Sequence, residues 1–239
     1  AQQAGCEWEN FVPPTTDWPI GRDFLGAVLS GQVLTPWTAS QLPVLQARQV
    51  DRWVVKLVRG NQMLAWIIEN FDLPAPVLLV RHPCAVYDSW IRRGWPVRSA
   101  PPRQDLLFFE AYPEYRRIVE GLTTPEEYFA AEWAMQHVSP MRQLVEGSYQ
   151  LCYYEKLRGD GSAEIQRIFS RWGIDLPLKL EQSLNRPSAK ASGDAKVRAT
   201  SRQPSWMKRL DKSLKSRMMR VLELFEVDLY EASGRPRPQ

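Results

Sequence analysis

Short apolar runs alternate along the chain with stretches in which apolar residues recur at helical spacing. Residues 52–58 (RWVVKLV) and 75–81 (APVLLVR) have the β-branched and aliphatic character of short buried strands. Between them, residues 61–71 (NQMLAWIIENF) carry apolar side chains at helical spacing. The order strand, helix, strand predicts a right-handed βαβ unit whose parallel strands are covered on both faces. The pattern therefore predicts an α/β fold.

Helical signals dominate the next part of the chain. Pro83 in a first turn predicts a helix that stops near Gly94. The stretch 103–147 reads as mostly helical, with the TPEE sequence at 124–127 as a start signal. A third strand is predicted at 149–157 (YQLCYYEKL).

Two further helices are predicted after this strand. Residues 162–174 (SAEIQRIFSRWGI) form an amphipathic helix that Gly173 ends. Residues 206–230 close the chain as a helix, and the tail at 233–239 is expected to fray.

Composition sets the size and the charge of the molecule. A chain of 239 residues with 44% hydrophobic side chains can bury one sizeable core, so a single domain over residues 1–239 is expected. The net charge of +4 is too mild to indicate a nucleic-acid or membrane surface, which would need clustered charge. No apolar stretch approaches the roughly 20 residues needed to span a bilayer. A small anionic ligand remains compatible with this composition.

The cysteines indicate a reducing environment. Cys6, Cys84 and Cys152 lie far apart and have no CxxC or Cys/His ligand spacing. The pattern predicts neither a disulfide framework nor a zinc site. The opening AQQAGCEWEN lacks the charged and apolar regions of a signal peptide. The cytoplasm is therefore the expected location.

An arginine and a serine follow the strand VLLV at 77–80. Ligands of an open parallel sheet bind beyond the carboxyl ends of the strands, and Arg81 occupies that position. Ser89 follows eight residues later, so both side chains reach one ligand only if the connecting turn folds back. An Arg fork and a hydroxyl suit a phosphate. The alternative is that Arg81 pairs with a surface carboxylate and that Ser89 has no ligand.

The arrangement resembles a known family. A buried strand that runs into Arg-x-Pro, with a serine eight residues beyond the arginine, resembles the 3′-phosphate-binding segment of sulfotransferases that use 3′-phosphoadenosine 5′-phosphosulfate (PAPS). The strand LCYYEKL and the helix AEIQRIFSRWGIDLP resemble the family's Tyr-Glu-x-Leu strand and the helix after it. The resemblance implies that Tyr154 packs against the adenine, a role suited to an aromatic ring. A core tyrosine at a strand end is the alternative.

Two more segments extend the resemblance. RWVVKLVRG resembles the segment that offers a strand-end lysine in tyrosylprotein and bacterial sulfotransferases, which implies that Lys56 neutralises charge on the leaving oxygen. LNRPSAKAS resembles the late Arg/Ser loop of the same subgroup, which implies that Ser188 contacts the bridging region and that Arg186 or Lys190 contacts the phosphates. A solvated strand-end lysine and a solvated basic loop are the alternatives.

A general base is also implied. AGCEWENF resembles the Gly-x-Glu stretch of the tyrosylprotein type, in which a glutamate takes the proton of the acceptor hydroxyl, and Glu7 is the corresponding residue. A solvated pair of Glu7 and Glu9 is the alternative. His82, in the Arg-His-Pro turn, is a second candidate base, whereas His137 is expected to be a packing residue.

One expected motif is missing. A sulfotransferase carries an Arg-Ser-Gly-Thr-Thr type loop whose backbone N–H groups cradle the 5′-phosphosulfate, and the sequence contains no such stretch. GRDFLGAV at 21–28 has glycines at Walker-like spacing but Ala27 and Val28 in place of Lys and Ser/Thr, so it reads as an ordinary helix start. We expect the loop to precede Ala1 in a longer protein; a lost loop is the alternative.

The resemblance implies a three-layer P-loop-NTPase-like α/β fold, with a central parallel sheet flanked by helices. The implied activity is transfer of a sulfuryl group from PAPS to a hydroxyl acceptor, with adenosine 3′,5′-bisphosphate (PAP) as the product and no metal. The alternative is a non-catalytic PAP-binding or scaffold module with a degenerate sulfotransferase fold. A kinase of similar topology would need a Walker lysine and a magnesium carboxylate, and neither is visible at a suitable place.

Overall fold

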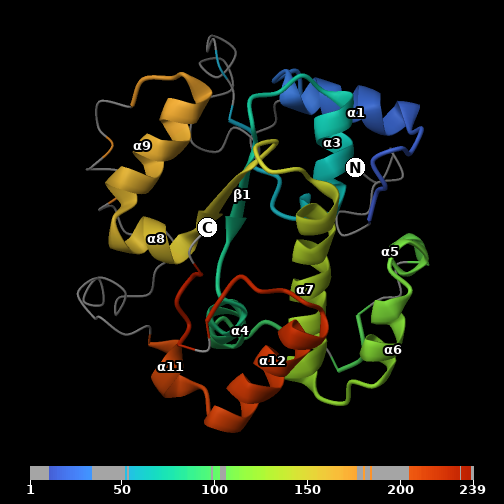
Figure 1. Cartoon of the computed structure of the whole chain (residues 1–239), viewed down its shortest axis with the longest axis vertical. Coiled ribbons are helices and arrows are strands. Elements are labelled where there is room, and N and C mark those ends of the chain that lie inside the picture. Colours follow the sequence, from blue (N-terminus) through green and yellow to red (C-terminus); the bar gives the residue numbers. More distant parts are fainter. Residues whose placement is uncertain are drawn as a thin grey trace.

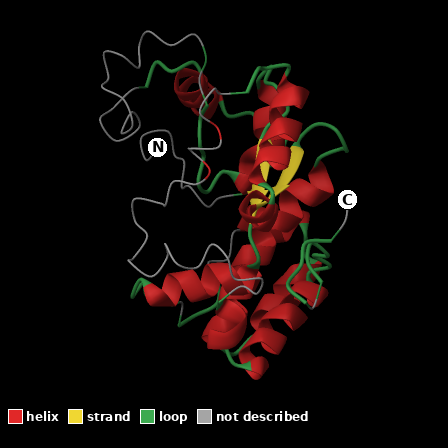
Figure 2. Cartoon of the chain, turned by 90° about the vertical axis from the view of Figure 1, so that its left-hand side faces the viewer, coloured by secondary structure: helices red, strands yellow, loops and turns green. Residues whose placement is uncertain are grey.

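The computed structural model of the chain describes residues 11–33, 52, 54–97, 99–102, 106–176, 180, 184, 205–231 and 233–237. Helices make up most of the described part, and two short strands lie among them (Figures 1 and 2). The elements in chain order are α1 (Pro19–Leu29), η2 (Asn61–Met63), α3 (Leu64–Asn70), β1 (Val77–Val80), α4 (Pro83–Arg92), α5 (Leu106–Ala111), α6 (Glu114–Glu120), α7 (Pro125–Gln143), β2 (Gln150–Tyr153), α8 (Tyr154–Gly159), α9 (Gly161–Trp172), α11 (Trp206–Arg209) and α12 (Lys212–Leu224).

The sheet consists of β1 and β2, which run parallel. Their register pairs Val77 with Gln150 at one end and Val80 with Tyr153 at the other. Both strands therefore finish at the same level. The prediction of an α/β fold with parallel strands is confirmed in this coarse form, whereas a three-layer P-loop-like sheet is not found among the described residues.

The strand predicted at 52–58 is corrected by the structure. Residues 54–58 are described and none of them is in a strand. Val54 and Val58 leave 83% and 70% of their surface exposed. β-Branched residues favour a strand because they pack well on a half-buried pleated surface, and here that packing is missing. The predicted helix that follows is present as η2 and α3.

Helices cover the sheet on two sides. Leu78 and Val80 of β1 and Tyr153 of β2 belong to the main hydrophobic core, which includes buried residues of α7 and α12. The other side of β2 lies against α9, where Arg167 donates a hydrogen bond of 2.9 Å to the carbonyl of Leu151. In Figure 1, α8 and α9 stand to the left of β1 and α7 stands to its right. The strands are thus held between α8 and α9 on one side and α7 on the other.

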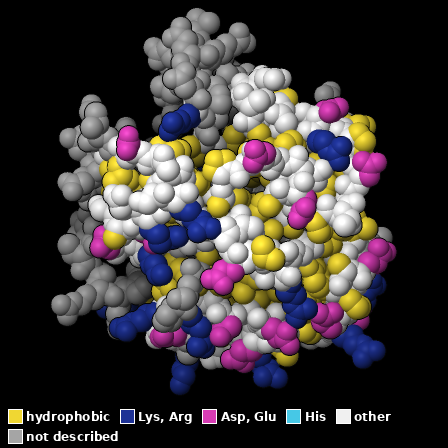
Figure 3. Space-filling view, turned by 45° about the horizontal axis from the view of Figure 1, so that its top comes forward, with side chains coloured by type: hydrophobic (Ala, Val, Ile, Leu, Met, Phe, Trp, Pro, Cys, Tyr) yellow, Lys and Arg dark blue, Asp and Glu magenta, His cyan; other side chains and the backbone are white. Residues whose placement is uncertain are grey.

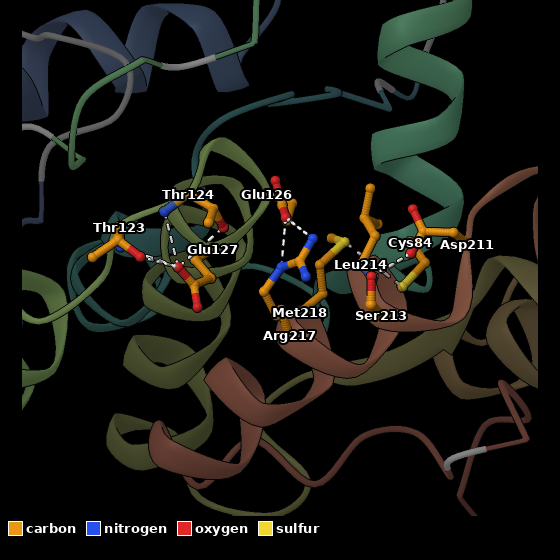
Figure 4. A network of polar contacts seen from close by, with 10 residues as sticks. All are labelled: Cys84, Thr123, Thr124, Glu126, Glu127, Asp211, Ser213, Leu214, Arg217 and Met218. Atoms are coloured by element: carbon orange, nitrogen blue, oxygen red, sulfur yellow. Dashed lines mark hydrogen bonds and ion pairs between the residues drawn. The ribbon is translucent and has the colours of Figure 1, made fainter.

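Helix α7 begins where the TPEE signal predicts. Thr124 is its N-cap, Pro125 occupies the first turn, and Glu127 completes a capping box by accepting the backbone N–H of Thr124 at 2.9 Å. The same turn is tied to α12, because Arg217 donates to the buried carboxylate of Glu126 at 2.7 Å (Figure 4). The longest helix is therefore fixed at its start by its own cap and by the last helix.

The structure corrects two predicted element boundaries and confirms a third. The third strand is shorter than predicted, because β2 ends at Tyr153 and the residues YEKL form the start of α8. The closing helix is broken at Leu210, and α12 starts anew at Lys212 after the N-cap Asp211, whose carboxylate accepts the backbone N–H of Leu214 at 2.8 Å. The end of α9 at Gly173 is confirmed, and this glycine has a left-handed φ of 64°.

The first helix packs on α3 in a second, smaller cluster formed by Val12, Leu25, Met63, Trp66 and Ile67. Gly21 of α1 faces the ring of Trp18 so closely that a Cβ would lie 2.0 Å from a ring carbon. The close packing of Trp18 therefore explains why position 21 has no side chain. The prediction that GRDFLGAV is an ordinary helix is therefore confirmed.

The segment after α12 returns to the core. Tyr230 forms an antiparallel bridge with Pro236, and the N–H of Arg237 donates to the carbonyl of Leu229 at 3.0 Å. Residues 233–237, within the tail that is expected to fray, thus lie beside Tyr230.

No helix in the described part of the chain is long and apolar enough to cross a bilayer.

An ion pair fixes α11 on α4. Both oxygens of the Asp88 carboxylate, which is 4% exposed, accept hydrogen bonds from Arg209, and Arg92 approaches one of them at 3.3 Å. Burial acts to raise the pKa of Asp88, but the hydrogen bonds and charges of Arg209 and Arg92 outweigh it and hold the pKa below its usual value. Asp88 is therefore ionised in the folded protein.

We expect Arg209→Ala to destabilise the fold by about 1.5–3 kcal/mol, because it leaves the buried Asp88 carboxylate with a single longer hydrogen bond, from Arg92 at 3.3 Å. Arg220→Ala, on the exposed side of α12, is the matched control and is expected to change the free energy of unfolding by less than about 0.5 kcal/mol. Urea unfolding followed by circular dichroism measures both. Equal stabilities of the two variants would contradict the assignment.

Candidate functional site

Arg81 and Tyr154 lie together at the carboxyl end of the sheet. Each is the first residue after its strand, and the register of β1 and β2 places them side by side. The guanidinium carbon of Arg81 lies 4.7 Å from the centroid of the Tyr154 ring. Both residues are half-buried. This is a cation–π contact at the edge of the sheet where ligands of parallel sheets bind.

Arg81 makes no ion pair with any residue that the structure describes. Contact with the ring face leaves the N–H groups at the rim of the guanidinium plane available as donors. An arginine at the end of a buried strand with these donors suits an anion, since guanidinium groups bind phosphate oxygens by charge-assisted hydrogen bonds. The alternative, a surface carboxylate as partner, finds none among the described residues.

The carboxylate of Glu155 joins two residues near this pair, His82 and Tyr230. Its Oε1 accepts the backbone N–H of His82 at 3.0 Å, and its Oε2 accepts the hydroxyl of Tyr230 at 2.9 Å. Burial and the negative charge of Glu155 raise the pKa of Tyr230 far above its usual value. Tyr230 therefore stays protonated and remains a donor.

His82 is a buried packing and capping residue. Its ring is 2% exposed, stacks on Trp206 at 4.4 Å and meets Tyr230 edge-on at 4.8 Å. Nδ1 accepts the backbone N–H of Cys84 at 3.2 Å, which caps α4. Burial lowers the pKa of His82 to about 3. These contacts use the ring for structure, so they give no support to the role of His82 as a base.

His137 is buried as well, in agreement with its expected packing role. Its Nδ1 lies 2.6 Å from the carbonyl of Trp133, one turn earlier in α7, and the two rings stack at 3.9 Å. Burial lowers its pKa to about 4. No histidine is visible on the face of the molecule drawn in Figure 3.

Ser89 lies on α4, two turns after the capping residue His82, and is half-buried. Positions 82, 86 and 89 share one face of the helix. No hydrogen bond joins Ser89 to Arg81 within the described residues. Their convergence on one phosphate therefore stays a prediction.

Of the remaining candidates, Lys56 is described and the others lie outside the described residues. Lys56 is exposed in the irregular segment 54–57 and, within the described part of the chain, has no hydrogen bond, ion pair or ring contact with Arg81 or Tyr154. Glu7, Arg186, Ser188 and Lys190 lie outside the described residues.

The described cysteines are buried thiols. Burial raises the pKa of Cys84 and of Cys152 to about 12, and the sulfur of Cys84 lies 3.8 Å from that of Met218. Such groups are poor nucleophiles at neutral pH. No cluster of three metal-binding side chains is present among the residues that are described.

A cavity of about 380 Å³ lies at the other end of the sheet. Pro76, which precedes β1, and Ser148, which precedes β2, line it together with residues 68–73 at the end of α3. Glu69 and Asp72 make this lining acidic. The cavity is thus at the amino ends of the strands and has the wrong charge for a phosphate.

Glu155, Tyr230 and Trp206 were not among the predicted site residues. Glu155 stands beside Tyr154 in the motif that carries the resemblance, and an acidic side chain directly after a strand was a usable signal. Tyr230 and Trp206 come from the last part of the chain, and their contacts with His82 arise from tertiary packing. No local pattern marks them.

A scan against models of known protein families, a search of curated proteins and a search of solved structures each find no match. The resemblance to sulfotransferases therefore rests on the sequence motifs alone. The pairing of Arg81 with Tyr154 is a separate observation, made from the geometry.

We expect acid to destabilise the protein through the two buried histidines. Their pKa values are lowered to about 3 and about 4 in the fold, whereas unfolded histidine titrates near 6.5. Below pH 6.5 the unfolded chain binds more protons, so stability falls until the folded pKa is reached. Between pH 7.5 and 5.5 each histidine contributes a loss of about 1.4 kcal/mol. In His137→Gln, urea unfolding should show about half of the wild-type loss; an unchanged loss would contradict the burial of a neutral His137.

Proposed function

We propose that the carboxyl end of the sheet binds a 3′-phosphorylated adenine nucleotide and that the chain has the α/β fold of PAPS-dependent sulfotransferases. The observation that carries this proposal is the pair of Arg81 and Tyr154 at the aligned ends of β1 and β2. Arg81 supplies a guanidinium without an ion pair in the described part of the chain, and Tyr154 supplies an aromatic face. A phosphate and a purine are the ligand groups that such side chains bind.

The two ends of the nucleotide have different partners in this proposal. Arg81 donates to the 3′-phosphate, with the hydroxyl of Ser89 as a second donor. Tyr154 packs against the adenine, and its other ring face keeps the contact with Arg81. The basic residues Arg186 and Lys190 contact the phosphates.

The proposed reaction is in-line transfer of a sulfuryl group. The acceptor hydroxyl oxygen bonds to sulfur while the bond from sulfur to the 5′-phosphate oxygen breaks, and adenosine 3′,5′-bisphosphate leaves. Glu7 takes the proton of the acceptor. Lys56 and Ser188 stabilise the charge that develops on the leaving oxygen. Positioning and charge stabilisation provide the catalysis, as in phosphoryl transfer, and the proposal requires no metal.

A second candidate is a module that binds the nucleotide without transferring sulfate. It is favoured by the absence of an Arg-Ser-Gly-Thr-Thr type loop from the printed sequence, because that loop would hold the reacting 5′-phosphosulfate. Both candidates bind PAP at Arg81. Transfer of radioactive sulfate from labelled PAPS to a panel of hydroxyl compounds distinguishes them.

We expect Arg81→Ala to weaken the binding of PAP by about tenfold or more, because it removes a charge-assisted hydrogen bond. Arg93→Ala is the matched control: Arg93 also lies over an aromatic ring, that of Trp95 at 5.1 Å, but it follows the other end of α4. Calorimetry measures both affinities. Wild-type affinity in Arg81→Ala would contradict the proposal.

Ser89→Ala is expected to weaken the binding of PAP by a smaller factor of about two to ten, as for the loss of one neutral hydrogen bond. Adenosine 5′-monophosphate should bind equally well to this variant and to the wild type, since it has no 3′-phosphate. An equal loss for both nucleotides would remove Ser89 from the phosphate site.

A further inference from the structure

The two proposed ligand-binding residues are joined through one carboxylate. Glu155 follows Tyr154 directly in the chain, and its Oε1 accepts the N–H of His82, which follows Arg81 directly. This N–H belongs to the peptide plane between Arg81 and His82. The hydrogen bond therefore fixes the backbone from which the Arg81 side chain departs, relative to the backbone that carries Tyr154.

The second oxygen of Glu155 is held from another part of the chain. Tyr230 donates its hydroxyl to Oε2 at 2.9 Å and is itself 3% exposed. Its ring meets His82 at 4.8 Å and Tyr153 at 5.5 Å, both edge-on. Both oxygens of Glu155 thus accept hydrogen bonds, and one of the donors is Tyr230 in the segment after α12.

An acidic residue in the first turn of a helix has an ordinary explanation, which is the helix dipole of α8. Glu155 occupies that turn. Its two hydrogen bonds, however, go to His82 and Tyr230, which lie outside α8. The carboxylate therefore connects three segments of the chain in addition to any effect on its own helix.

We infer that Glu155 is the positioning residue of this site, which sets Arg81 against Tyr154 so that one nucleotide contacts both. The inference rests on the proposed function. Loss of the bridge should leave the protein folded but should lower its preference for a 3′-phosphate, because that preference depends on where Arg81 stands relative to the base. A purely structural role would lower stability without changing the preference.

Glu155→Gln tests the inference, with Glu164→Gln as the matched control. Glu164 is a buried glutamate held by Arg167 at 2.8 Å on α9, behind β2. Calorimetry gives the dissociation constants of PAP and of adenosine 5′-monophosphate. The constant of adenosine 5′-monophosphate divided by that of PAP measures the preference for the 3′-phosphate. We expect the ratio to fall by about two- to tenfold in Glu155→Gln, as for one hydrogen bond, and to stay unchanged in Glu164→Gln.

The double variant Arg81→Ala/Glu155→Gln tests the route of the effect. If Glu155 acts through Arg81, its replacement causes no further fall in the ratio once Arg81 is removed. Should Glu155→Gln fail to fold, Tyr230→Phe replaces it, since this change removes only the hydroxyl that holds Oε2. Its ratio is expected to fall in the same direction.

The outcomes separate the inference from the function on which it rests. A wild-type protein that binds both nucleotides equally would overturn the proposed function, and the inference with it. A ratio that falls in Arg81→Ala but stays at the wild-type value in Glu155→Gln and Tyr230→Phe would overturn the role of Glu155 alone. An equal fall of the ratio in Glu155→Gln and Glu164→Gln would show that Glu155 has only a structural role.

Discussion

The in-register pairing of β1 and β2 is the constraint on which the candidate site depends. Because Val80 lies opposite Tyr153, the two strands end at the same level, and the next residue of each is brought to the same edge. A shift of one residue would turn the side chains of one strand to the other face of the sheet. The contact of Arg81 with Tyr154 is thus a consequence of strand register, and neither residue is placed by its own local sequence.

The helices maintain this register by packing and by a small number of polar bonds. Leu78, Val80 and Tyr153 share the main core with α7 and α12, and α9 holds the other side of β2 through Arg167. The end of the sheet is then closed by buried rings, where His82 stacks on Trp206. Burial lowers the pKa of His82 to about 3, so the ring is neutral at physiological pH and serves to pack the end of the sheet.

The sequence was informative where the signal is local. The Thr-Pro-Glu-Glu start of α7, Pro83 at the start of α4 and Gly173 at the end of α9 each act on backbone groups within a few residues, and each prediction is confirmed. The failures are tertiary. Residues 54–58 have strand composition but expose Val54 and Val58, and the YEKL stretch is helical although it directly follows β2. For the site, Arg81 was found because it follows a strand, whereas Glu155 and Tyr230 needed the three-dimensional contacts that join residues 82, 155 and 230.

The central claim is that the carboxyl end of the sheet, and not the acidic cavity at its amino end, is the nucleotide site. A crystal structure of the protein with adenosine 3′,5′-bisphosphate tests this claim most directly. The account predicts that the 3′-phosphate lies within hydrogen-bonding distance of the Arg81 guanidinium and that the adenine lies against Tyr154. A nucleotide bound elsewhere, with Arg81 and Tyr154 left in contact with each other alone, would contradict it.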